Sequence, residues 1–191
     1  MIKKIILIIF FFFYSITAFG YFKIIATVDT ETITKLDLDN EKLIVKLLNK
    51  NINYNNSSIL LNNLIDQKIR YLEIKKENIE INFKSIDEDY NILLQKLKIE
   101  KNQVQKNLIP LIKEKIKIEK YWNRIILKKY GWKLNVNMKE IENKVQANIE
   151  KIKDLDQFKE NLIIQEQNKK LSVFSNYHLN KLKKQVLIKF Y

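Results

Sequence analysis

The chain has 191 residues with 35 basic and 22 acidic side chains, so its formal net charge is +13 at pH 7. The absence of cysteine excludes disulfides and thiolate metal sites, and a single histidine leaves little for building a metal centre or a catalytic triad. The lysines alternate with acidic residues and are not clustered with arginine, which disfavours nucleic acid as the partner.

The N-terminus has the order of segments found in secretory signal peptides. Lys3 and Lys4 precede an apolar run over 5–14, and small residues stand at Ala18 and Gly20. We therefore predict a signal peptide over residues 1–20, cleaved after Gly20, and export of the mature chain. The alternative is that the segment is retained as a membrane anchor, although spanning normally requires about 20 apolar residues.

The two clearest β-prone runs lie at opposite ends of the predicted mature chain. The first run is 23–28, in which side chains alternate in the manner of a strand. A turn and the short β-prone run Thr32–Ile33 follow it. The second long run is 186–191. If the ends pair, they close the whole chain. The predicted fold is therefore mainly α, a multi-helix bundle closed by a small antiparallel sheet formed from the N-terminal hairpin and the C-terminal strand.

Apolar residues at helical spacing predict two helices in the first half of this bundle. Thr34 caps the first helix, which the asparagine-rich stretch 49–56 ends, and Ser57 or Ser58 opens the second. Residues 77–83 read as an extended connection, and Ser85 with Glu88 forms a capping box for the next helix.

The second half continues with helices separated by short links. The only proline, Pro110, suits the first turn of a helix that runs to Tyr130, and Gly131 suits a left-handed cap after it. Residues 132–136 then form an extended link, Asn137 opens a further helix, and a long helix runs from about Leu155.

These elements predict a signal peptide over 1–20 and one folded domain. The helical core covers 21–153, and residues 154–191 supply the closing helix and strand of the same domain.

Few residues have the chemistry of a catalytic or metal site. His178 has no matching signature around it and reads as a residue at the border of a buried helix face, and Asp37 and Asp39 read as first-turn acids of a helix. Apart from Gly20, the only glycine is Gly131, so no glycine-rich phosphate loop is expected. We therefore expect neither an enzyme nor a cofactor.

Three aromatic residues are the candidates for contact with a bound polypeptide: Trp122, Tyr130 and Trp132. Aromatic side chains combine a large apolar surface with a polar group and often anchor protein interfaces. The alternative for each is a place in the core at the end of a helix.

The order of these elements resembles the N-terminal domain of the SurA family of periplasmic chaperones. The resemblance rests on the acidic helix start at 34–37, the Leu-Ile-x-x-x-Ile pattern within 61–72 and the acidic-capped helix at 138–141. The closing pattern over 174–190 resembles the helix and strand that return to the N-terminal strand in that family.

The chain departs from the family in one large respect. Between Asn143 and Leu162 there are too few residues for the parvulin prolyl isomerase domains that the family carries there, and the histidines of such a site are missing. The resemblance thus implies a periplasmic holdase without isomerase activity.

Such a holdase would act without ATP and bind unfolded outer-membrane precursors in a helical apolar cradle, with contact to the membrane assembly machinery at its periphery. The alternatives are a non-catalytic structural or adaptor protein of a cell-envelope complex, anchored by an uncleaved N-terminal helix, and a basic helical protein that binds nucleic acid.

Overall fold

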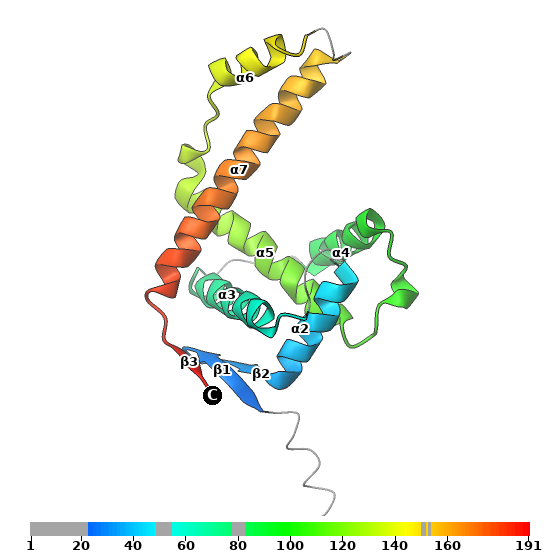
Figure 1. Ribbon diagram of the computed structural model, residues 1–191, viewed down its shortest axis with the longest axis vertical. Helices are drawn as coiled ribbons and strands as arrows, with labels where there is room; N and C mark the ends of the chain where they lie inside the picture. Colours follow the sequence, from blue (N-terminus) through cyan, green and yellow to red (C-terminus); the bar gives the residue numbers. More distant parts are fainter. Residues whose placement is uncertain (1–22, 49–54, 78–82, 150–151, 153) are drawn as a thin grey trace, which may run out of the picture.

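The computed structural model describes residues 23–48, 55–77, 83–149, 152 and 154–191. Within these residues it has six α-helices and one three-stranded antiparallel sheet, as predicted. The sheet lies at one end of the molecule with α3 (Ser57–Lys76) beside it, and the long helix α7 (Leu155–Lys183) runs to the far end, where α6 (Met138–Gln146) accompanies it (Figure 1). The predicted signal peptide lies outside the described residues.

The sheet joins the two ends of the described chain. Its order is β2 (Glu31–Thr34), β1 (Ile24–Val28), β3 (Ile188–Phe190), with both pairings antiparallel. Ala26 pairs with Ile33 on one side and with Phe190 on the other. The predicted meeting of the N-terminal hairpin and the C-terminal strand is therefore confirmed.

A two-residue turn ties the hairpin to the last strand. Val28 pairs with Glu31, so Asp29 and Thr30 form the turn, and Asp29 has a left-handed φ of 50°. The Asp29 N–H donates to the Leu187 carbonyl at 2.9 Å, and the Leu187 N–H donates to the Asp29 carboxylate at 2.7 Å. One aspartate thus closes the hairpin and holds the start of β3.

Side-chain caps open the first two helices. At the start of α2 (Lys35–Leu48), the Asp37 N–H donates to the Thr34 hydroxyl at 3.2 Å and the Thr34 N–H donates to the Asp37 carboxylate at 2.7 Å, a reciprocal cap. The helix α3 begins at Ser57, but its cap is Asn56, whose Oδ1 accepts from the N–H groups of Ser58 and Ile59.

The helix α4 (Phe83–Leu97) begins two residues before the predicted cap. Ser85 therefore lies in its first turn, and its predicted place as the N-cap residue is wrong. The predicted connection over 77–83 falls mostly on residues 78–82, outside the described residues.

The helix α5 (Ile109–Tyr130) has Pro110 in its first turn and ends as predicted. Gly131 does not have the predicted left-handed conformation: its φ is −53°, and it begins the short 3-10 turn η3 (Gly131–Lys133). The chain continues in a right-handed turn, so the prediction of an extended link is wrong over Trp132, Lys133 and Leu134. A second 3-10 turn, η2 (Lys101–Gln103), lies between α4 and α5.

The helix α6 lies away from the helices before it, and α7 leads the chain back to them (Figure 1). The helix α6 follows Asn137, and α7 begins after Asp154, whose carboxylate accepts from the Gln157 N–H at 2.9 Å. We call α6 together with residues 155–170 the arm, and the remaining described residues the body. Figure 1 shows the arm rising from the body along α7.

Two hydrophobic clusters hold the body together. The larger lies between the sheet, α2, α3, α5 and the end of α7, and includes Trp122, Ile125 and Leu179. The smaller joins α4 and the start of α5 to Ile44 of α2. In the described part of the chain, the arm contains a single buried residue, Ile141.

No helix among the described residues has both the length and the apolar content needed to cross a bilayer.

Candidate functional site

A hollow lies among α2, α3, α4 and α5. Its volume is about 840 Å³, within the range of ligand-binding pockets. We call it the helical hollow. It is lined by Glu41, Leu48, Asn63, Asp66, Gln67, Arg70, Asp89, Ile92, Leu93, Lys96, Ile112, Lys115, Ile116, Ile118, Glu119, Lys120 and Asn123.

Residues of both hydrophobic clusters line the hollow. Ile118 belongs to the larger cluster, whereas Leu93, Ile112 and Ile116 belong to the smaller one. Ile112 is buried beneath the hollow, and Ile92 is 46% exposed beside it. The lining thus has an aliphatic part that water reaches.

Ion pairs surround this aliphatic part. Lys115 contacts Glu41 at 2.7 Å and Arg70 contacts Glu119 at 2.6 Å. Lys120 and Lys183 likewise pair with Asp89 and Asp66. The lining contains four acidic and four basic side chains, so their formal charges sum to zero.

The structure separates the three predicted contact residues. Trp122 is 0% exposed, and its indole N–H donates to the Ser175 hydroxyl at 2.7 Å. It is a core residue and cannot contact a bound polypeptide in this structure. Trp132 is 72% exposed, and Tyr130 is half-buried against α7. Only Tyr130 and Trp132 therefore remain candidates, and neither lines the helical hollow.

The sequence contained a partial signal for the hollow. Leu93 and Ile116 stand at helical spacing from other apolar residues of their helices, and both line it. Periodicity identifies an apolar helix face but does not tell whether another helix covers it. The polar lining residues gave no signal, because charged residues on helices usually face solvent.

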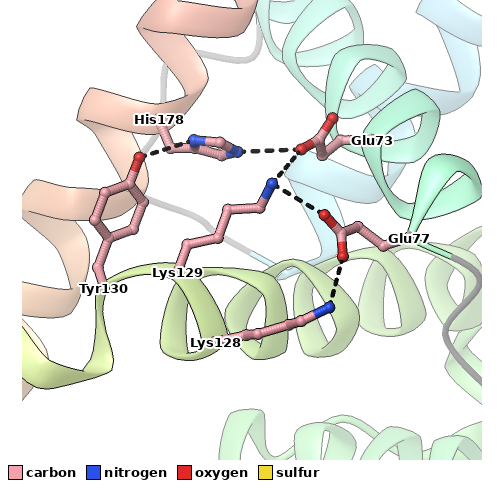
Figure 2. Close-up of polar contacts among 6 residues, drawn as sticks. All are labelled: Glu73, Glu77, Lys128, Lys129, Tyr130 and His178. Atoms are coloured by element: carbon pink, nitrogen blue, oxygen red, sulfur yellow. Dashed lines mark hydrogen bonds and ion pairs between the residues drawn. The ribbon is translucent and has the colours of Figure 1, made fainter.

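A partly buried polar network joins α3, α5 and α7 (Figure 2). His178 is 5% exposed, with Nδ1 3.0 Å from the Tyr130 hydroxyl and Nε2 3.4 Å from the Glu73 carboxylate. Since an ionised carboxylate only accepts, Nε2 of the neutral ring carries the proton and Nδ1 accepts from the tyrosine. Lys129 bridges Glu73 and Glu77 at 3.0 Å each, and Lys128 pairs with Glu77.

The pKa values of His178 and Glu73 are both lowered in this network. Burial lowers the pKa of His178 below 6.5, and the nearby Lys129 adds to this against the opposing effect of Glu73. Burial alone would raise the pKa of Glu73, but Lys129 and His178 outweigh it and bring that pKa below 4.5. At neutral pH the ring is therefore neutral and the carboxylate ionised.

This network is suited to holding helices together and has no open position for a reactant. Both ring nitrogens of His178 already have partners, and Trp122 covers the ring with centroids 5.4 Å apart. Within the described ranges, no three side chains from His, Cys, Asp and Glu form a group able to hold a metal ion.

The chain matches no family model and no curated protein.

Proposed function

We propose that this chain is an exported chaperone that holds unfolded outer-membrane protein precursors without ATP. The observation that carries the proposal is the helical hollow, a space with an aliphatic lining and a balanced charged rim. Exposed apolar surface rimmed by polar groups is typical of sites that bind other polypeptides. The signal-like N-terminus supports export, and the resemblance to the SurA family supports the client class.

The composition of the hollow suits weak binding of many sequences. A volume of about 840 Å³ accommodates a few side chains of an extended segment. The aliphatic groups offer contact without directional demands, and the paired charges offer no net attraction for one sign of client charge. Release then follows from the fast dissociation of weak contacts and requires no nucleotide.

The direct test is aggregation of a denatured porin diluted into buffer, followed by light scattering. A several-fold excess of the purified chain should suppress the scattering. The variant Ile92→Ser with Ile116→Ser removes aliphatic lining and should reduce the suppression, since both residues line the hollow.

The matched control is Leu43→Ser with Ile59→Ser, which removes similar side chains that lie partly exposed outside the hollow. It should retain the suppression. If the unmodified chain leaves aggregation unchanged, the proposal fails. If the two double variants lose activity equally, the hollow is not the binding site.

A structural or adaptor protein is the second candidate, and the apolar run at 5–14 favours it if that run is retained. A retained segment would anchor the chain at the membrane and make the exposed apolar residues part of a permanent interface. Intact mass of the protein isolated from cells separates the two, because loss of residues 1–20 supports the chaperone and their presence supports the adaptor.

A further inference from the structure

A second and smaller hollow lies where the arm meets the body. It lies between η3 and the outer side of α7 and has a volume of about 330 Å³. We call it the elbow hollow. It is lined by Lys133, Glu166, Lys169, Lys170, Val173 and Phe174.

One aromatic residue, Phe174, lines this hollow, and its ring is held in place by neighbouring rings. Phe174 stacks on Tyr130 with ring centroids 5.3 Å apart and an interplanar angle of 8°, and Tyr177 meets Tyr130 edge-on at 6.2 Å. Val173 and Tyr177 lie four residues apart on one face of α7, and they are 58% and 60% exposed. Stacking fixes the ring of Phe174, and Val173 and Tyr177 beside it are open to solvent.

The charge of the elbow hollow is positive, unlike that of the helical hollow. Three lysines line it, and the single acid, Glu166, is already neutralised by Lys144 at 3.4 Å. Within the described part of the chain, neither Lys133 nor Lys169 forms an ion pair. The Lys133 ammonium lies 4.7 Å from the ring centroid of Trp132 and 5.8 Å from that of Phe174.

We propose that the elbow hollow binds an extended polypeptide segment in which an aromatic or aliphatic side chain is flanked by Asp or Glu. The apolar side chain would contact Val173 and Phe174, while the flanking carboxylates would pair with Lys133 and Lys169. This inference rests on the proposed function in that an unfolded polypeptide is the ligand. It adds a selectivity that the neutral helical hollow does not have.

The same lysines and the exposed Trp132 could also suit a single-stranded nucleic acid, in which bases stack on aromatic rings. The lining favours the peptide, because the exposed aliphatic side chain of Val173 suits an apolar side chain and offers nothing on which a base can stack.

The two tryptophans provide a direct measurement. Trp132 is 72% exposed and Trp122 is 0% exposed, so acrylamide quenching of the full chain reports mainly on Trp132. The probes are three tryptophan-free peptides of equal length: one with Phe between acidic residues, one with Phe between lysines, and the acidic one with Phe replaced by Ser. A short single-stranded oligonucleotide is the fourth probe.

The acidic Phe peptide should protect Trp132 from quenching and bind at least about tenfold more tightly than the other three probes. The variant Lys133→Glu with Lys169→Glu should remove this preference or reverse it. The control Lys42→Glu with Lys189→Glu changes net charge equally at exposed positions on α2 and β3, and should change affinity by less than about twofold at physiological salt. Trp132→Phe should abolish the signal, because Trp122 is shielded.

Equal binding of the acidic and basic peptides would overturn the inference, as would equal losses in the two charge variants or tighter binding of the oligonucleotide. Equal binding of the Ser peptide would also overturn it, since only charge would then be recognised. Suppression of porin aggregation is measured separately. If the chain binds the acidic peptide but does not suppress aggregation, the chaperone proposal alone is rejected. If it suppresses aggregation but does not bind the acidic peptide, the elbow inference alone is rejected.

Discussion

The body and the arm are built from the same kinds of helix but are stabilised in different ways. In the body, three strands and five helices contribute to shared hydrophobic clusters. In the arm, Ile141 of α6 is the buried residue, and Lys144 forms ion pairs with Glu140 and Glu166 through partly exposed side chains. Exposed ion pairs contribute little to stability, so the arm should open more readily than the body.

The largest effect should come from the core of the body. Trp122→Ala removes a fully buried indole and its hydrogen bond to Ser175, and should lower the free energy of unfolding by about 3–5 kcal/mol. Val173→Ala on the exposed side of α7 should cost less than about 0.5 kcal/mol. Urea unfolding of both variants tests the contrast. Similar costs at the two positions would show that Trp122 is not tightly packed.

Ile141→Ala tests whether the arm unfolds independently of the body. The change removes the buried anchor of α6 and should cost about 2 kcal/mol or more, confined to the arm. Hydrogen exchange measured by mass spectrometry should become faster in α6 and the first half of α7 and stay unchanged in β1 and α5. Faster exchange in the sheet as well would mean that the arm and body unfold together.

Substitutions at Asp29 test the connection between the hairpin and β3. Asp29→Ala loses the acceptor for the Leu187 N–H and places alanine at a left-handed φ, so it should cost about 1–2 kcal/mol. Asn tolerates this conformation and keeps an acceptor, so Asp29→Asn should cost less. Thermal unfolding of the two variants gives the order, and a reversed order would reject the hydrogen bond as the main contribution.

The smallest effect should be a pH dependence from His178. Its pKa in the folded state is lowered below 6.5, so the unfolded chain binds more protons in this range. The resulting stabilisation is present above pH 6.5 and is lost as pH falls through the folded pKa. The charged or titratable groups around the ring are Glu73 of α3, Lys129 and Tyr130 of α5, and Lys181 of α7.

Melting temperatures between pH 7.5 and 5.5 measure this dependence, and they should fall by a few degrees at most. His178→Gln should flatten the profile while lowering stability at pH 7.5, because it removes the titrating ring and its contacts. The pKa of Glu73 is lowered below 4.5, so its titration lies outside the range from pH 7.5 to 5.5. An unchanged slope in the variant would assign the dependence to another group.

The sequence contained enough local information to predict most of the fold. Thr34 caps its helix as expected because capping depends on residues within one turn, and the strand runs have β propensity that is visible locally. Gly131 was misassigned because glycine permits a left-handed cap without requiring one. Its actual conformation follows from the turn that leads to α6.

The candidate sites were less predictable than the fold, because they depend on contacts between distant segments. Trp122 is enclosed by residues such as Ser175 on α7, more than 50 positions away, whereas Trp132 is left uncovered by the turn that contains it. Phe174 and Tyr177 were not among the predicted contact residues. They approach Tyr130 only because α5 and α7 pack together, which helical periodicity alone cannot show.

The pairing of Asp29 with Leu187 has a consequence for the order of folding. The contact joins residues 158 positions apart, and closing so long a loop is unfavourable until the intervening helices are in place. We expect β3 to dock late, after the rate-limiting step. Weakening this contact should then accelerate unfolding while leaving the refolding rate almost unchanged, so that the last strand determines how long the native molecule persists.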